Sequence, residues 1–484
     1  MADSNAKKLA QLLDGNGDVL LDNLDNISVT PAGVSDQPNT STGGFTLPAG
    51  TSAQRPGSPD TGETRYNSTT GSVEFYDGTA WIATNLIPTL DSASGNIYNS
   101  IATTLTLSLT NATDTIDVVF KESGVDLATV TGVSVSSGSA TVSVPSAVYG
   151  QTAGDTIVIS VNNVDGTPSS NNQNKTVIGL PSGGTRTVDG NTVYHSFSAG
   201  TSTLAVPSGF SSNDVDVLIV AGGGGGGCGN GANSASGEGS GGGGGGAGGL
   251  VYWGGSESAF DDQSVNLAQG TNYSIVVGTG GTGAQAESAV ASNGGNSTAF
   301  GFTALGGGGA SSHETQTQSR SGGSGGGAHD RTIPSSGGAG IQFSTYSYGY
   351  GNAGGGGQDL SSGDRYECGA GGGGAGAAGQ DCNRNDTDNT PGNGGVGRDY
   401  SSVFGTSYGD SGWFAGGGGG GGGNPTYTQV YGDGGTGGGG RGGGGATGPS
   451  QGTDGTGSGG GGGQEATYGA DGGDGIVLVK YTIS

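Results

Sequence analysis

The stretch VDVLIVAGGGGGGCGNGANSASGEGSGGGGGGAGGLVYW, from Val215 to Trp253, alternates twice between β-favouring apolar residues and unbroken glycine. The apolar residues before the first glycine run predict a buried strand. Glycine loses more conformational freedom on ordering than any other residue, so glycine runs normally form flexible linkers. The stretch therefore poses a choice between glycine as a loose tether and glycine as a hydrogen-bonded framework.

The composition argues against a single large globule. Of the 484 residues, 116 are glycine and 30% are hydrophobic, whereas one compact globule of this length needs a larger apolar fraction. We therefore expect several modules in series. The formal net charge of -26, with 14 Lys and Arg residues, argues against binding to nucleic acid or to anionic membranes.

The chain shows neither a transmembrane pattern nor a disulfide framework. No apolar run is long enough for a membrane span, and the opening MADSNAKKLA lacks the apolar core of a secretory signal. We therefore expect no membrane insertion and synthesis in a reducing cytosol. Cys228, Cys368 and Cys382 are too few for a disulfide framework. Free thiols are favoured, with pairing of Cys368 and Cys382 as the alternative.

The first 30 residues predict a docking segment. Leu9, Leu12 and Leu13 have helical spacing, and the turn residues 14–17 end the pattern. Such a short helix needs a partner to be stable. The string DGNGDVLLDNLD superficially suits a calcium loop, but Val19 occupies the position of the required glycine, so a solvated turn is preferred. Residues 31–49 predict a linker.

Two β-rich regions follow. In residues 50–85, short strands at 65–67, 73–76 and 81–82 are separated by Thr-Gly and Asp-Gly turns. This piece is too small to close a core of its own, which favours self-association into a homotrimer. Residues 86–180 contain LTLSLT, TIDVVF, ATVSV and DTIVISVNN, which alternate with period two. Their spacing predicts an immunoglobulin-like sandwich.

Residues 183–484 predict a glycine framework. The runs are separated by irregular segments rich in Tyr, Asn, Asp and Arg, unlike repetitive Gly/Ser linkers. Apolar strands at Val215–Val220 and Ile476–Tyr481 should pair and close the region. Glycine in the polyproline II conformation has three residues per turn, and without side chains such helices can bond sideways through their backbones. The expected fold class is thus mainly β and irregular, with a polyglycine II bundle closed by strands.

The segments between the glycine runs carry most of the tyrosines. Rigid aromatic side chains beside Asn, Ser and Gly are typical of adaptable recognition loops, and Arg is a frequent interface anchor. Packing against the bundle is the alternative role for each ring. The predicted receptor-contacting residues are Tyr346, Tyr348, Tyr350, Arg365, Tyr366, Arg384, Tyr400, Tyr408, Tyr427 and Tyr431.

Catalysis and cofactor binding are not expected. The sequence has no paired carboxylates on a β-helix repeat, no Cys/His spacing for zinc and no G-K-[ST] after its glycine runs. His195, His313 and His329 are scattered, and His195 lies in a strand pattern that favours a structural role.

Three stretches resemble bacteriophage tail fibres. The pattern AQRP, RYN, EFYDG and AW within residues 53–81 is similar to a small β-module of tail fibres and other virion proteins. The first 26 residues look like the N-termini of marine phage fibres, and VDVLIVAGGGGGG with GDGIVLVKY resembles glycine-rich distal fibre domains. The resemblance implies a non-enzymatic virion fibre that docks on tail or baseplate/adaptor proteins by its N-terminus. Its tip would bind a host surface glycan or outer-membrane protein.

Two other functions remain open. The chain could be a structural virion spacer whose receptor is bound by another protein. It could also be a cell-derived adhesin or ice-binding glycine protein, which the missing signal peptide and tripeptide period disfavour.

Overall fold

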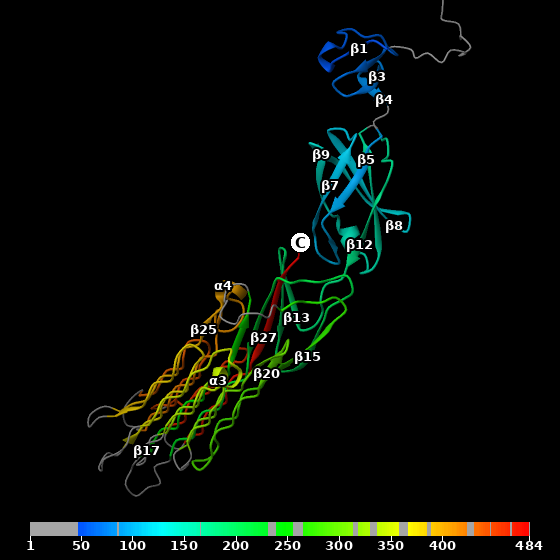
Figure 1. The fold of residues 1–484 in the computed structure, drawn as a ribbon. Helices are drawn as coiled ribbons and strands as arrows, with labels where there is room; N and C mark the ends of the chain where they lie inside the picture. The colour runs from blue at the N-terminus through cyan, green and yellow to red at the C-terminus, as the bar shows by residue number, and fades with distance from the viewer. Residues whose placement is uncertain are drawn as a thin grey trace, which may run out of the picture. The chain divides into compact units, whose positions relative to one another are not determined.

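The structure, a computed structural model, describes residues 47–84, 87–164, 166–230, 239–254, 265–312, 318–329, 336–357, 366–384, 389–423, 430–445, 447–464 and 467–483 (Figure 1). The chain divides into two compact units, with the boundary in the sequence between residues 86 and 87. This boundary falls where the sequence predicts a change from the small β-module to the sandwich. The predicted docking segment 1–30 and all but the last residues of the linker lie outside the described residues.

The first unit contains the small β-module. Its sheet has the order β1-β2-β3-β4, with β1 at Ala49–Gly50, β2 at Thr64–Asn67, β3 at Ser72–Tyr76 and β4 at Trp81–Thr84. A 3-10 turn, η2, spans Ser52–Gln54. The three predicted strands are confirmed as β2, β3 and β4.

An ion cluster forms the centre of this module. Glu74 is 1% exposed and Arg65 is 5% exposed. The Glu74 carboxylate accepts hydrogen bonds from Arg55 at 2.7 Å and from Asn67 at 2.8 Å, and Arg65 Nε lies 3.4 Å from it. Burial alone would raise the pKa of Glu74, but the bonds from Arg55 and Asn67 outweigh it and lower that pKa. Polar pairing thus replaces the hydrophobic core that so short a chain cannot build.

The second unit begins with a sandwich of immunoglobulin type. One sheet pairs β5 (Thr89–Ser94), β7 (Thr104–Thr110), β10 (Ser139–Ser143) and β9 (Val125–Ser136), and the other pairs β9 with β8 (Thr115–Glu122), β11 (Thr156–Asn163) and β12 (Gln173–Ile178). This is the A-B-E-D and C-F-G pairing of immunoglobulin folds. The register of β9 shifts twice against β8, and β9 belongs to both sheets. The predicted sandwich is confirmed; β6 (Ile97–Tyr98) and α2 (Ser146–Tyr149) complete it.

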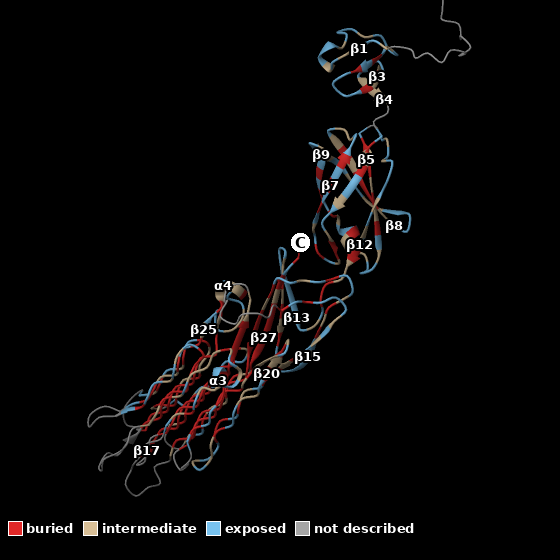
Figure 2. Cartoon of the chain, viewed as in Figure 1, coloured by how far each residue is buried: buried red, intermediate tan, exposed pale blue. Residues whose placement is uncertain are grey.

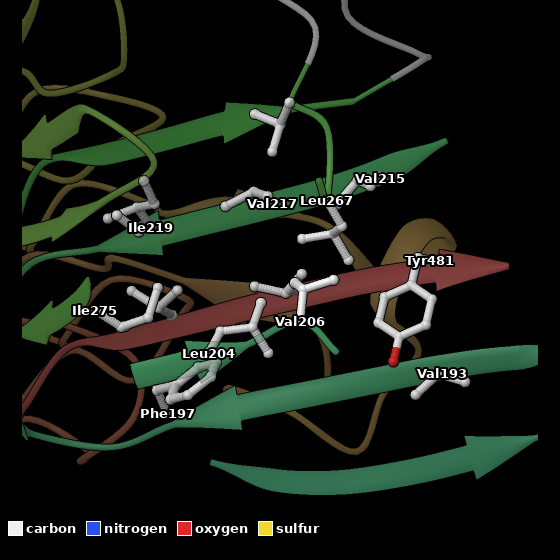
Figure 3. Close-up of a cluster of buried hydrophobic side chains, with 14 of the residues drawn as sticks. Val193, Phe197, Leu204, Val206, Val215, Val217, Ile219, Leu267, Ile275 and Tyr481 are labelled. Carbon is white, nitrogen blue, oxygen red and sulfur yellow. The ribbon is translucent and has the colours of Figure 1, made fainter. Parts of the chain in front are cut away.

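A second β-sandwich forms the base of the glycine-rich region. One sheet has the order β13-β14-β27-β16-β18 and the other has the order β15-β19-β20-β21. Figure 3 shows apolar side chains of both sheets meeting in one core, among them Val217, Leu204 and Ile275. The bounds are Thr185–Asp189 (β13), Thr192–Phe197 (β14), Gly200–Ala205 (β15), Val215–Val220 (β16), Leu250–Trp253 (β18), Asn272–Val277 (β19), Ser297–Ala299 (β20), Phe302–Ala304 (β21) and Ile476–Thr482 (β27).

Strand β16 shows why the sequence before the glycine run is continuously apolar. It pairs antiparallel with β27, with Val215 opposite Tyr481 and Val220 opposite Ile476, which confirms the predicted closure of the region. Its odd-numbered residues face the core of Figure 3, whereas Leu218 and Val220 face a second apolar cluster. A strand buried on both faces needs apolar residues at successive positions.

His195 in β14 is structural, in agreement with its strand pattern. It is fully buried, its Nδ1 lies 2.8 Å from the carbonyl oxygen of Gly183, and its Nε2 lies 3.2 Å from the Tyr481 hydroxyl. Burial lowers the pKa of His195 and raises that of Tyr481. A neutral ring that donates to Gly183 and accepts from Tyr481 therefore joins β14 to β27.

The glycine runs are threefold helices bonded sideways. In the run 222–229, Gly223, Gly226 and Gly229 donate to the carbonyl oxygens of Gly473, Ala470 and Thr467. The partner number falls by three whenever the donor number rises by three. This spacing is that of a helix with three residues per turn whose neighbour runs antiparallel. Figure 1 shows the runs lying side by side below the base.

Each face of the run 222–229 meets another run. Its amides donate to the antiparallel runs 240–246, 292–295 and 467–473, and its carbonyls accept from the parallel runs 281–284, 307–310 and 460–463. Among the described residues, the run therefore has six bonded neighbours. The runs 241–249 and 416–423 show the same three-residue spacing. The expected polyglycine II bundle is confirmed, and Figure 2 shows its interior as buried.

Space, rather than backbone freedom, requires glycine inside the bundle. A Cβ atom added at Gly223, Gly245 or Gly418 would come closer than 3.0 Å to the backbone of a neighbouring run. Real Cβ atoms essentially never approach backbone atoms so closely. Any side chain at these positions would push two hydrogen-bonded runs apart.

The remaining elements are short. They are β17 (Gly239–Ser240), α3 (Gln342–Tyr346), β22 (Tyr366–Glu367), β23 (Asn383–Arg384), β24 (Asn389–Thr390), β25 (Arg398–Asp399), α4 (Ser401–Phe404) and β26 (Trp413–Phe414). Among the described residues, no helix is both long and apolar enough to span a membrane.

Replacing Gly245 by Ala should destabilise the glycine bundle by about 3 kcal/mol, the upper end of overpacking costs, because the clash is with backbone. Gly448→Ala is the matched control, since nothing lies within 4 Å of the added Cβ. Urea denaturation of both variants measures the difference. Equal, small effects would contradict the packing requirement.

Replacing Glu74 by Gln should destabilise the small module by about 3 kcal/mol, because it leaves two buried or half-buried guanidinium groups without their carboxylate. The pKa of Glu74 is lowered in the folded state. The contribution of Glu74 to the stability of the folded module is therefore complete above about pH 4.3, the ordinary pKa of glutamate. This contribution is lost as the pH falls through the lower pKa that Glu74 has in the folded state.

Hydrogen exchange of the amides in β2 and β3 measures this effect at pH 7. The partly exposed Glu63, which accepts a long 3.3 Å bond from the Asp60 amide, provides the control Glu63→Gln. Equal protection in the Glu74 and Glu63 variants would show that the ion cluster contributes no stability.

Candidate functional site

The bundle has two ends, and the predicted receptor-contacting residues that the structure describes are divided between them. Gly222 lies two residues after the end of β16 and marks the strand end, whereas Gly229 marks the far end. Tyr346, Tyr348 and Tyr350 lie beside β18 and β21 at the strand end, and Tyr400 and Tyr408 lie beside β16 and β18 there. Of the other five, Tyr366, Arg384 and Tyr431 begin or end segments at the far end. Arg365 and Tyr427 lie outside the described residues.

The segment 341–350 clamps the open edge of the base sandwich. The buried side chain of Gln342 accepts from the Leu305 amide at 2.8 Å and donates to the Thr303 carbonyl oxygen at 3.0 Å. Tyr350 exchanges backbone hydrogen bonds with Leu250 in β18. The segment thus joins β18 to β21 and to Leu305, which follows β21. Tyr350 has a structural role here, and Arg398 covers its ring at 3.6 Å.

A ladder of four rings lies along this edge. Tyr346 stacks on Tyr348 with centroids 5.4 Å apart, Tyr348 meets Phe302 edge-on at 5.4 Å, and Phe302 stacks on Trp253 at 5.2 Å. All four rings are half-buried, so each keeps an accessible part. Phe343 beside them is 60% exposed. The sequence analysis did not single out Phe302 or Trp253 as site residues. Phe300 and Phe302 flank Gly301 in the sequence, and two rings around a glycine could have indicated a hairpin that presents aromatic residues.

Tyr400 packs in the interior. It is 2% exposed, and its ring lies 4.9 Å from that of Tyr252. Because Tyr400 is buried, it offers no surface to a receptor in this structure. Its predicted role as a receptor contact is therefore corrected to packing against the bundle. The buried Phe404 and Phe414 belong to the same cluster. Tyr408 is half-buried and lies 6.2 Å from Tyr194.

At the far end, short ladders join the runs. β17 pairs in parallel with β22, so Tyr366 lies opposite Gly239, and β23 pairs with β24, so Arg384 lies opposite Asn389. Tyr431 is half-buried with the guanidinium of Arg441 4.6 Å from its ring centroid. These backbone pairings hold the described ends of the runs at defined positions.

A disulfide between Cys368 and Cys382 corrects the expectation of free thiols. Both cysteines are fully buried, with Cα atoms 5.8 Å apart, within the usual range for a disulfide. Gly371 donates to the Gln380 carbonyl oxygen, so the backbone pairing of the two runs brings the cysteines together. The spacing of 14 residues between the two cysteines in the sequence did not indicate the disulfide, because the distance between them depends on how the glycine runs pack.

Cys228 is a buried free cysteine at the far end. Burial, assisted by Glu287, raises the pKa of its thiol to about 11. A thiol that remains protonated at neutral pH is a poor nucleophile, so Cys228 acts as a small packing residue beside Ala284 and Ala291.

The described residues assemble one serine–histidine contact. Ser311 Oγ lies 2.9 Å from His329 Nδ1. Ser319 Oγ donates to the Gly327 carbonyl oxygen at 2.6 Å and lies 3.0 Å from Ser311 Oγ. Ser311 is fully buried and His329 is 3% exposed, so the contact joins glycine runs and is closed to a substrate. Within the described ranges, no group of three or more His, Cys, Asp and Glu residues could hold a metal. His313 lies outside those ranges.

Reduction of the disulfide should destabilise the far end by about 3 kcal/mol, the value expected for a closed loop of this length. Amide exchange in residues 366–384 with and without dithiothreitol measures the effect. With and without dithiothreitol, the amides of Cys382→Ser should exchange at the faster rate of the natural chain whose disulfide is reduced. Cys228→Ala should respond to the reductant like the natural chain. A reductant effect that persists in Cys382→Ser would contradict the assignment.

The family of the chain follows from its glycine-rich part. A comparison with curated proteins finds no match. Residues 196–482 match the family described as glycine-rich domain. The match starts near the end of β14 and ends in β27, two strands that pair with each other. It covers the bundle and the base strands from β15 to β27, and leaves out β13 and most of β14. Since it spans more than half of the chain, this protein belongs to the glycine-rich domain family.

Proposed function

We propose that the chain is a subunit of a bacteriophage tail fibre that adsorbs to a bacterial surface receptor through its glycine-rich domain. Its N-terminal segment docks on tail or baseplate/adaptor proteins, and the fibre is a homotrimer in the virion after synthesis in the host cytoplasm. The observation that carries the proposal is the hydrogen-bonded glycine bundle, whose described runs are bonded to neighbouring runs and therefore end at fixed positions.

Rigidity favours recognition over spacing. A flexible glycine linker loses conformational entropy whenever a partner fixes it, and that loss weakens binding. In the bundle, the run 222–229 is fixed by bonds to neighbours on all sides. Residues that leave such runs begin at fixed positions, which lowers the entropic cost of binding through them.

The small module supports the virion setting. Its resemblance to tail-fibre modules rests on the AQRP, RYN and EFYDG motifs. Arg55, Arg65, Asn67 and Glu74 from these motifs meet in the ion cluster at the centre of the module. The matched residues therefore specify a fold, which makes the resemblance more informative than shared composition.

The exposed rings supply candidate contact area. Phe343, Tyr346 and Tyr348 present aromatic surface at the strand end, and Tyr431 with Arg441 presents it at the far end. Tyrosine and arginine give large contact areas at low entropic cost. Tyr366 and Arg384 remain proposed receptor contacts at the far end, and Arg365 and Tyr427, which lie outside the described residues, remain proposed receptor contacts.

The spacer function has one observation in its favour. Tyr350 and Tyr400 serve packing, and Tyr408 packs on Tyr194. Exchange of the region between Ala339 and Asp433 for that of a related fibre separates the two functions. An altered host range supports receptor binding by this chain, and an unaltered one supports the spacer.

The purified full-length chain should adsorb to susceptible bacteria and reduce phage plaques by competition. Gly245→Ala, which disrupts the support, should lose adsorption at temperatures where the bundle is loosened, and Gly448→Ala should adsorb like the natural chain. Cell pull-down and plaque counts on a panel of strains measure both effects. Folded chain that neither adsorbs nor competes on any susceptible strain would overturn the proposal.

A further inference from the structure

An open groove lies at the tip of the β20–β21 hairpin in the base sandwich. Its volume is about 550 Å³. Its lining includes the aromatic residues Tyr273, Phe300 and Phe302 and the polar residues Asn266, Asn272 and Ser274. The rings of Tyr273 and Phe300 are 4.7 Å apart, and Phe302 continues into the stack with Trp253. The groove therefore combines aromatic rings with polar lining residues.

Phe300 occupies an unfavourable backbone conformation there. Ala299 pairs with Phe302, so Phe300 and Gly301 form a two-residue hairpin loop with φ values of 52° and 84°. Two positive φ values define a turn that strongly prefers Asn-Gly. A bulky aromatic residue in the left-handed region is a true outlier. Such strain is a recognised mark of functional positions, and here it holds a ring at the groove.

Tyr273 is locked in place beside it. Its hydroxyl donates to the Asn266 carbonyl oxygen at 2.7 Å and accepts from the Ala268 amide at 3.0 Å. Both bonds run to the loop after residue 264, so the ring orientation is fixed before any ligand arrives. A fixed ring loses little conformational freedom on binding.

The lining selects a class of ligand. None of the described residues that line the groove is charged, although the chain carries a net charge of -26. Among these described lining residues, an anionic or cationic ligand would find no counter-charge. Flat apolar faces beside amide and hydroxyl groups suit a molecule that has C–H faces and hydroxyl groups at its edge, which describes a neutral pyranose.

We propose that this groove binds a neutral hexose unit of a bacterial surface polysaccharide, with the sugar ring stacked on Phe300 and Tyr273. Asn272 and Ser274, both exposed, bond to the sugar hydroxyls. The inference rests on the proposed receptor binding and deepens it, because it names the ligand class and a second surface away from the far end.

Phe300→Asn is the decisive variant, because asparagine fits the turn better than phenylalanine does. It removes the ring and relieves the backbone, so the unfolding midpoint should stay constant or rise. Binding of maltotriose, mannotriose, lactose and N-acetylated chitotriose, all neutral, to the full chain is measured by calorimetry and saturation-transfer NMR. At least one sugar should bind, and Phe300→Asn should weaken it by about tenfold or more.

Asn272→Ala should weaken the same sugar severalfold at unchanged stability, whereas Tyr468→Ala, which removes a 59% exposed ring outside the groove, should leave binding unchanged. Heparin, an anionic polysaccharide, should not compete. A lower midpoint with unaltered sugar binding in Phe300→Asn would assign the ring to packing and overturn the inference.

Cell adsorption separates this inference from the proposed function. If the natural chain adsorbs to cells but binds none of the four sugars, or if Phe300→Asn adsorbs undiminished, the groove is excluded and the fibre function stands. If the chain binds sugar through Phe300 but adsorbs to no susceptible strain, the fibre function fails instead.

Discussion

Sideways hydrogen bonding between bare backbones, repeated every three residues, is the constraint on which the glycine-rich domain depends. Ordering one residue costs about 1–2 kcal/mol, and one hydrogen bond returns about 1 kcal/mol net. A single glycine run therefore cannot remain ordered. In the run 222–229, amides and carbonyls both find partners in neighbouring runs, so order in one run stabilises the next. The same close approach excludes a Cβ at Gly223 or Gly245.

The base sandwich starts and aligns this bundle. β16 and β27 pair along their full apolar length, and each continues from or into glycine, so the first and last runs begin in a fixed register. The clamp of Gln342 and Tyr350 then ties a later segment to the same base. At the far end, the disulfide between Cys368 and Cys382 cross-links two runs. Hydrophobic packing thus stabilises the base of the domain, backbone hydrogen bonds hold the glycine runs together, and the disulfide cross-links two runs at the far end.

Several sequence predictions proved correct because they rest on local patterns. Period-two alternation found the strands of the immunoglobulin-like sandwich, and the apolar residues 215–220 and 476–481 found the closing pair. The location of the aromatic residues could not be predicted in the same way. Tyr400 and Tyr348 both flank glycine runs in the sequence, yet one is buried against Tyr252 and the other is half-exposed in a ring ladder. Which ring faces inward depends on the neighbouring run.

The sequence by itself determined the strand-to-glycine entry, the three-residue geometry and the requirement for many runs, because each follows from the properties of consecutive residues. Only the tertiary structure decided which runs are neighbours. That choice pairs Cys368 with Cys382, divides the described members of the predicted contact residues between two ends, and assembles Tyr273, Phe300 and Phe302 into one groove. The physical reason is that glycine runs are nearly identical as hydrogen-bonding partners, so the segments between them select the arrangement through contacts distant in sequence.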